Sequence, residues 1–178
     1  MSSKRKFRIE IIKTVIDDIC EVAKDFPEIL DERNGIWLEL DYNLGTDFAT
    51  TESGHIIHLN AVYFSDMNIL VKDYHDGVAE GRFAKGTDWR AIGRHETGHV
   101  VAHMRNIDSM KLAMNILGTK SKAAVYEHLI NELSIYSVEY EDGREIISEC
   151  FSAFYGDTGN RFAERFVEEC KDNSMKGR

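Results

Sequence analysis

The stretch DWRAIGRHETGHVVAHM, residues 88–104, has its side chains spaced for an amphipathic helix. Its apolar residues and its first two histidines recur at intervals of three and four residues, which places them on one side of a helix. Thr87 or Asp88 is suited to cap the first turn. We therefore predict a helix that begins near residue 88 and ends near residue 104.

The chain before this helix predicts a short helical segment followed by strands. Residues 9–23 have helical spacing, and the helix is expected to stop near Phe26-Pro27 because the residue before a proline avoids the helical region. Residues 36–42 alternate in polarity, and residues 55–64 are rich in β-branched and aromatic side chains, so both predict strands. The intervening stretch, with Gly45 and Gly54, is expected to be a loop.

The chain after residue 104 keeps helical spacing. Apolar stripes predict helices over residues 122–136, around residues 146–154 and from about residue 162. A small β element thus precedes a mostly helical C-terminal half, which predicts an α+β fold rather than an alternating α/β fold. The 178 residues contain no internal repeat and no linker, so we expect a single domain over residues 1–178.

The charge of the chain disfavours two classes of partner. There are 31 acidic and 22 basic residues, and the formal net charge is −9. A surface this acidic repels phosphate backbones and anionic lipid head groups, so we expect no nucleic acid partner and no membrane partner. No run approaches the roughly 20 apolar residues that a membrane-spanning helix needs.

The cysteines favour a reducing compartment. Cys20, Cys150 and Cys170 are widely spaced and odd in number, and they form no C-x-x-C pair. Lone thiols of this kind are typical of cytoplasmic proteins rather than of secreted disulfide-bonded ones. We therefore expect a cytoplasmic location.

The central helix carries the motif H-E-x-x-H as His95-Glu96-Thr97-Gly98-His99. Residues at i and i+4 lie one turn apart on the same helical face, so the two imidazoles are able to share one metal ion. Glu96 is placed to take a proton from a metal-bound water. Zinc is the expected ion, because a site with two histidines and one carboxylate leaves a position open for water.

The third ligand has to come from outside this helix. A metzincin needs Gly and His at the positions that Ala102 and Arg105 occupy. His103 lies about 12 Å along the helix axis from His95, so we interpret it as a surface or supporting residue. Glu145 and Glu149 lie one turn apart on an otherwise apolar helix, where acids are costly unless they are paired with a cation or a metal.

The pairing of H-E-x-G-H with the later E-x-x-x-E-x-F resembles gluzincin zinc metallopeptidases. The resemblance spans about residues 55–155 and is strongest to the group of the anthrax lethal factor catalytic domain and related phage-encoded peptidases. It implies a zincin-like fold, hydrolysis of peptide or protein substrates, Glu145 as zinc ligand and Glu149 as the residue that orients a histidine. Ser148 departs from the alanine that is usual in this family.

The resemblance also implies a tyrosine that stabilises the oxyanion. The segment Leu133–Ser137 is similar to the S-x-Y-A segment of the family, which makes Tyr136 the expected residue. The interval from this tyrosine to Glu145 is longer than in the family, so Tyr140 is the alternative.

In zincin folds an edge strand beside the active-site helix pairs with extended peptide substrates, and the strand over residues 55–64 is expected to take this role. His55 and His58 lie at i and i+3 of that strand and face opposite sides, so we interpret them as ordinary strand residues rather than ligands. Trp37 and Trp89 are expected to be core or pocket aromatics.

Two other hypotheses remain open at the level of sequence. The chain also resembles the H-E-x-G-H domain of repressor-cleaving regulators in mobile elements, in which the nearest equivalent of the ligand glutamate is Glu132. The other is a non-catalytic binding or scaffold module, such as a virion-associated protein, in which the metal is structural or absent.

Overall fold

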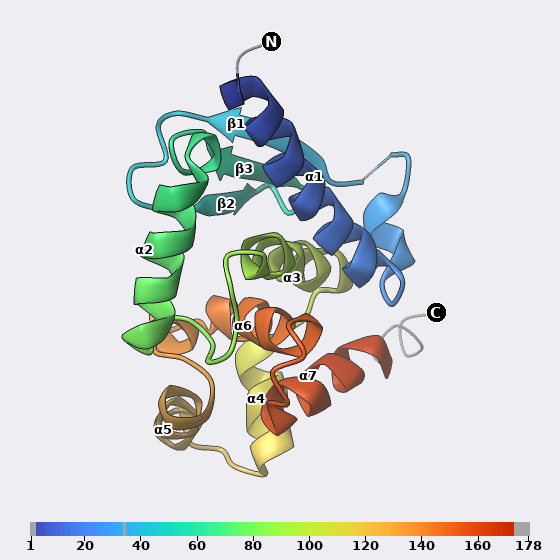
Figure 1. Cartoon of the computed structure of the whole chain (residues 1–178). Helices are drawn as coiled ribbons and strands as arrows, with labels where there is room; N and C mark the ends of the chain where they lie inside the picture. The colour runs from blue at the N-terminus through green and yellow to red at the C-terminus, as the bar shows by residue number, and fades with distance from the viewer. Residues whose placement is uncertain (1–2, 34, 173–178) are drawn as a thin grey trace.

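The computed structural model describes residues 3–33 and 35–172, which form helices around a small sheet (Figure 1). Within this part of the chain there are seven α-helices and three strands, which confirms the α+β class. The α-helices are α1 Ser3–Ala23, α2 Met67–Ala79, α3 Ala91–Arg105, α4 Ser109–Leu117, α5 Lys122–Glu132, α6 Arg144–Tyr155 and α7 Arg161–Asp172. The strands are β1 Trp37–Asp41, β2 Ala49–Glu52 and β3 Ile56–Asn60, and short 3-10 helices occupy Pro27–Leu30, Tyr63–Ser65 and Tyr136–Val138.

The sheet has the order β1-β3-β2, with β1 parallel and β2 antiparallel to β3. The prediction that residues 55–64 form an edge strand is therefore wrong, because β3 pairs on both sides. Ile57 and Leu59 lie two residues apart, so their burial shows that one face of β3 packs against the core. The edge strand beside α3 is β2, which lies in the stretch expected to be a loop.

The helix boundaries differ from the predicted ones at two places that matter for the site. The helix predicted over residues 122–136 ends at Glu132, so Tyr136 lies in a 3-10 turn. Ser134 and Ser137 stabilise this turn, because Ser134 Oγ accepts from the Ser137 N–H and Ser137 Oγ donates to the Ser134 carbonyl. Such local bonds compete with helix continuation.

The helix predicted from residue 88 begins at Ala91. Asp88 does not cap it; its side chain accepts a hydrogen bond from the Arg90 N–H in the turn before the helix.

Helix α3 lies at the centre of the molecule and holds the layers together. It packs against α6 on one side and against α1 and β2 on the other (Figure 1). The core around it contains fully buried aromatic side chains from distant parts of the chain, namely Phe26, Phe64, Phe151 and Phe166. A residue on α3 can therefore face either the sheet or the C-terminal helices, depending on its position around the helix axis.

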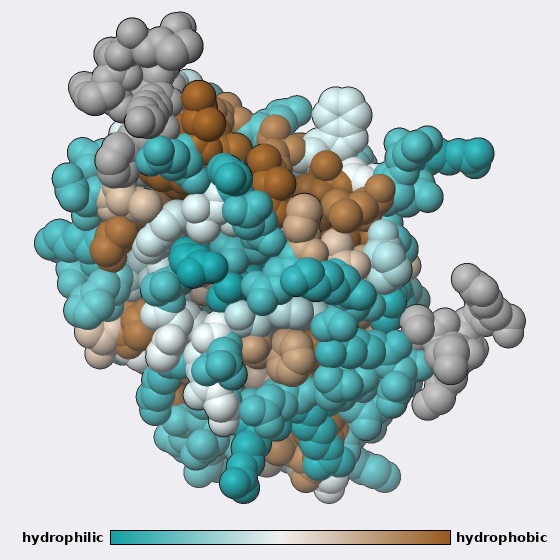
Figure 2. Space-filling model, turned by 45° about the vertical axis from the view of Figure 1, so that its right-hand side comes forward, coloured by the Kyte–Doolittle hydropathy of each residue, from teal (hydrophilic) through white to brown (hydrophobic). Residues whose placement is uncertain are grey.

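Several large apolar side chains are exposed near the N-terminal layer. They include Ile9 and Ile16 on α1 and Trp37 and Leu40 on β1. Figure 2 shows apolar side chains gathered at the height of α1 and the sheet. The prediction that Trp37 is a core or pocket residue is wrong, because it is 66% exposed on an edge strand, whereas Trp89 packs against the core. Among the described helices, none is both long and apolar enough to cross a membrane.

Candidate metal centre

Three predicted ligands converge between α3 and α6. Oε2 of Glu145 lies 3.0 Å from Nε2 of His95 and 3.3 Å from Nε2 of His99. One ligand atom from each residue lies within 4.8 Å of the other two, and no other set of His, Cys, Asp or Glu in the described chain forms such a group. A tetrahedral zinc ion with ligand distances of about 2.0–2.1 Å separates its ligand atoms by roughly 3.3 Å. The donor set and its spacing therefore fit a zinc ion.

A close helix crossing brings these residues together. A Cβ atom built on Gly98 would lie 2.9 Å from Cα of Ser148, closer than side chains tolerate. Glycine at this position lets α3 approach α6 within one turn of His95 and His99. Glu145, in the first turn of α6, then reaches both imidazoles.

Glu149 contacts the opposite side of the His95 ring. Its Oε1 lies 3.0 Å from His95 Nδ1, and its Oε2 accepts a hydrogen bond of 2.8 Å from the backbone N–H of Ala84. Glu149 is 1% exposed, so both oxygens are held by protein groups rather than by water. A carboxylate on the far nitrogen of a ligating histidine fixes the ring and leaves the other nitrogen for the metal.

The two carboxylates also set the charge of His95. Burial disfavours the imidazolium, but the hydrogen bonds with Glu145 and Glu149 outweigh it and hold the pKa of His95 well above its usual value. Burial likewise acts to raise the pKa of Glu145, yet the contacts with His95 and His99 lower it below its usual range. The two carboxylates therefore favour a positive charge at this position.

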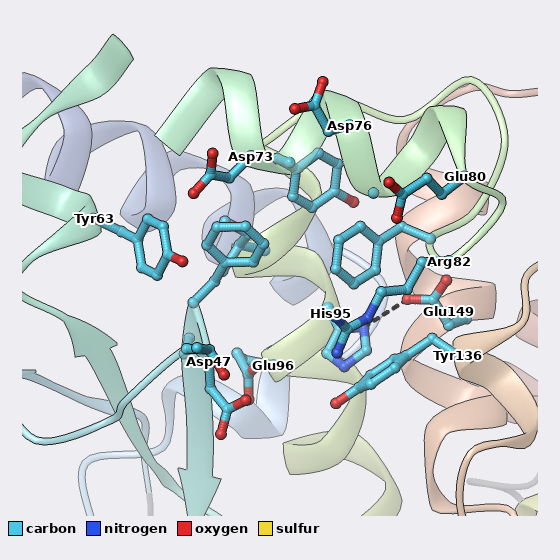
Figure 3. A pocket seen from close by; sticks show the side chains of 17 residues that line it. Asp47, Tyr63, Asp73, Asp76, Glu80, Arg82, His95, Glu96, Tyr136 and Glu149 are labelled. Carbon is cyan, nitrogen blue, oxygen red and sulfur yellow. Dashed lines mark hydrogen bonds and ion pairs between the residues drawn. The ribbon is translucent and has the colours of Figure 1, made fainter. Parts of the chain in front are cut away.

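Glu96 points from α3 toward the sheet. It is 5% exposed, and its Oε2 accepts a hydrogen bond of 2.7 Å from the Thr51 hydroxyl on β2. The same hydroxyl lies 3.2 Å from the Glu96 carbonyl. Glu96 and His95 line one pocket, so the carboxylate borders the same space as the imidazole of a candidate ligand (Figure 3).

Tyr136 lines the same pocket, on the other side of His95. Its ring centroid lies 5.7 Å from that of His95. Burial, together with the charge of Glu145, raises the pKa of Tyr136, so its hydroxyl stays protonated and able to donate. Tyr140, the alternative, is 41% exposed and lies under the Arg144 guanidinium at 4.8 Å.

The remaining candidates lie outside this group. His103 is exposed near the end of α3, and its ring fills the space above Gly54. His58 contacts Glu52 at 3.1 Å and His55 contacts the Ser53 carbonyl at 2.9 Å. Glu132 is exposed at the end of α5.

Two groups that hold side chains of the site in place were not predicted from the sequence, namely the Thr51 hydroxyl, which bonds Glu96, and the Ala84 backbone N–H, which bonds Glu149. The paired β-branched residues Thr50-Thr51 are a signal of a strand. Two threonines are too short a signal to stand out between the glycines of a stretch expected to be a loop. No signal identifies the Ala84 N–H, because any residue except proline carries one.

Comparison of the chain with protein-family models, with curated proteins and with solved structures finds no match. The chemistry of the site is therefore inferred from its side chains. A set of two imidazoles and one carboxylate is able to hold a zinc ion while leaving a coordination position open, which is the arrangement of catalytic rather than structural zinc sites.

Proposed function

We propose that the protein is a zinc-dependent metallopeptidase of the gluzincin type with a zincin-like fold. The observation that carries the proposal is the convergence of His95, His99 and Glu145, with Glu149 on the far nitrogen of His95. A metal site built only for stability has no need of Glu96 and Tyr136 beside it, both lining one pocket.

Glu96 and Tyr136 have separate roles in the proposed hydrolysis. When bound, zinc supplies a Lewis acid that polarises a water molecule and a substrate carbonyl. Glu96 accepts the proton of the attacking water and passes it to the leaving amine. The Tyr136 hydroxyl donates a hydrogen bond to the oxyanion that develops on the former carbonyl oxygen.

Strand β2 supports a peptide as the substrate. It is an edge strand, and its Thr51 hydroxyl bonds Glu96. An extended peptide that pairs with the free edge of β2 therefore runs past Glu96, using backbone groups of any sequence.

We also infer a cytoplasmic location. Cys20, Cys150 and Cys170 are all free thiols in the structure. Unpaired cysteines suit a reducing compartment.

Metal content tests the site. Purified wild-type protein is expected to hold about one zinc per chain by mass spectrometry, and Glu145→Ala to lose it or bind it much more weakly. Glu132→Ala is the matched control, because it removes an exposed carboxylate outside the group. Zinc lost on Glu132→Ala and retained on Glu145→Ala would instead support the regulator hypothesis, and a wild type without affinity for zinc would support the scaffold hypothesis.

Activity tests the chemistry. Glu96→Gln is expected to keep zinc and to abolish hydrolysis of peptides that the wild type cleaves, because the amide cannot accept the proton of water. Retained turnover in this variant would exclude Glu96 as the base.

A further inference from the structure

The candidate site opens into a pocket lined by aromatic and acidic side chains. The pocket has a volume of about 260 Å³ and lies between α2, the start of β2 and the segment after α2. Figure 3 shows His95, Glu96 and Tyr136 on one side of the pocket, and Asp73 and Asp76 of α2, with Glu80 directly after α2, on the other side. Ligand pockets commonly measure about 300–1,000 Å³, so this one suits a single long side chain.

A continuous row of aromatic rings forms the wall. Phe48 lies 4.6 Å from Tyr63 and 6.0 Å from Phe83, measured between ring centroids. Phe83 stacks on Tyr74 at 4.9 Å and meets Tyr136 at 5.9 Å. The faces of such rings are electronegative and attract cations that lie over them.

The rim of the pocket is acidic. The carboxylates of Asp47, Asp73, Asp76 and Glu80 line it, and Arg82 is the one lysine or arginine among the described lining residues. Lys72 contacts Asp76 at 2.6 Å and Asp73 at 3.8 Å. The side chains of Asp47 and Glu80 make no hydrogen bond or ion pair with any described residue.

The aromatic wall already holds one cation. The Arg82 guanidinium lies 5.6 Å from the Phe83 ring centroid and 5.7 Å from that of Tyr136. Both distances are within the roughly 6 Å over which a cation interacts with a ring face. The rings of Phe48, Tyr63 and Tyr74 line the same pocket without a cation of this kind among the described residues.

We propose that this pocket binds the side chain of a lysine or arginine in the substrate, so that the enzyme cleaves peptides next to cationic residues. The proposal rests on the proposed function, because the pocket is a substrate subsite only if the adjoining site cleaves peptides. The aromatic wall takes the aliphatic stem and the charged end, and the carboxylates of Asp47 and Glu80, which pair with no described residue, supply the opposite charge.

Binding to an inactive variant tests the pocket separately from catalysis. The probes are two acetylated and amidated five-residue alanine peptides, one with a central lysine and one with a central norleucine, which has the same four-carbon chain but no ammonium group. We expect zinc-loaded Glu96→Gln to bind the lysine peptide about five- to thirty-fold more tightly, by NMR titration.

Two variants examine the source of the preference. Asp47→Asn combined with Glu80→Gln is expected to remove most of it, whereas Glu127→Gln, an exposed acid on α5, leaves it unchanged. Equal affinity for the two peptides, tighter binding of norleucine, or no binding of either overturns the proposal.

Cleavage by the wild type separates this proposal from the proposed function. A mixed peptide library is digested and the cleavage sites are mapped by mass spectrometry. Cleavage enriched next to lysine or arginine supports both proposals, and cleavage without that enrichment overturns the cationic pocket alone. If no peptide is cleaved while Glu96→Gln still prefers the lysine peptide, the preference of the pocket for a cationic side chain stands, whereas the peptidase function and the role of the pocket as a substrate subsite fail.

Discussion

Nδ1 of His95 lies 3.0 Å from Oε1 of Glu149, and this contact determines which nitrogen of the ring is presented to a metal. A proton on Nδ1 bonds the Glu149 carboxylate, which leaves Nε2, on the side of Glu145, for a metal. The backbone N–H of Ala84 holds the other oxygen of Glu149 and prevents the carboxylate from rotating away. The candidate metal site thus depends on the segment around Ala84, which contributes no candidate ligand to it.

Glu149→Gln is expected to weaken zinc binding by about 10- to 100-fold without removing a ligand. The neutral amide accepts a weaker hydrogen bond from His95. Its NH₂ group then faces the Ala84 N–H, which is another donor and cannot accept a hydrogen bond. Competition against a chelator of known affinity measures the change, with Glu127→Gln as the control for a surface charge. Unchanged affinity would show that Glu149 does not orient His95.

Thr51→Val is expected to lower kcat about tenfold or more while zinc content and KM stay close to those of the wild type. The substitution keeps the shape of the side chain but removes the hydroxyl that bonds Glu96 at 2.7 Å, and hydrogen bonds to charged groups contribute about 1.5–3 kcal/mol. Steady-state kinetics on a cleaved peptide measures the change. Thr51→Ser retains the hydroxyl and should restore kcat, so a serine variant as slow as the valine variant would contradict this role.

Gly98→Ala is expected to destabilise the fold by about 1–3 kcal/mol and to reduce zinc affinity at least tenfold. Replacing glycine by alanine in the interior of an exposed helix normally stabilises the helix by about 1 kcal/mol. A loss of stability in Gly98→Ala would therefore indicate the steric clash. Here the added Cβ meets the backbone of Ser148 and pushes α6 away from α3, together with Glu145. Denaturant unfolding and zinc titration measure the two effects.

Ser148→Ala is the matched substitution on the other side of this crossing. Ser148 Oγ is buried and has no hydrogen-bond partner among the described residues. Removing an unsatisfied hydroxyl is expected to leave stability unchanged or to raise it by about 1 kcal/mol, with zinc affinity unaltered. Loss of stability would mean that this hydroxyl has a partner, such as a buried water.

Asp18 is expected to make the folded protein less stable as the pH rises from about 4 to about 6. It is 1% exposed, and burial raises the pKa of its carboxyl to about 6 although Arg94 lies 2.9 Å away. Because this exceeds the ordinary value near 3.8, the folded state binds more protons than the unfolded state in that window, and the free energy of unfolding falls with rising pH.

The substitution Asp18→Asn isolates this effect. Its stability relative to the wild type is expected to improve by about 2–3 kcal/mol between pH 4 and pH 7, measured by urea unfolding. Asp17→Asn, an exposed neighbour, should show little change. A relative loss of stability for Asp18→Asn over this range would mean that the ion pair with Arg94 outweighs desolvation.

Most of the helices were predictable because helical periodicity is a local property of the chain. The spacing of His95 and His99 places both imidazoles on one face of any helix, whatever surrounds it. The same holds for Glu145 and Glu149 on α6, and the helical content of the C-terminal half follows from the same spacing. Interruptions by side-chain hydrogen bonds, as at Ser134 and Ser137, do not alter the apolar pattern, and so Tyr136 was predicted inside a helix.

The arrangement between elements was decided only by the tertiary structure. Residues 95 and 145 are far apart along the chain. They come into contact only because α3 and α6 cross closely, with Gly98 of α3 against Ser148 of α6. The position of β3 between β1 and β2 depends on backbone pairing. The side chains of a four-residue strand such as β2 give too short a pattern to predict that pairing. The aromatic and acidic pocket is assembled from α2, β2 and α3, and no segment of the chain contains its pattern. Spacing along one helix therefore determined the paired histidines, whereas packing between elements decided which carboxylate meets them and what the site opens onto.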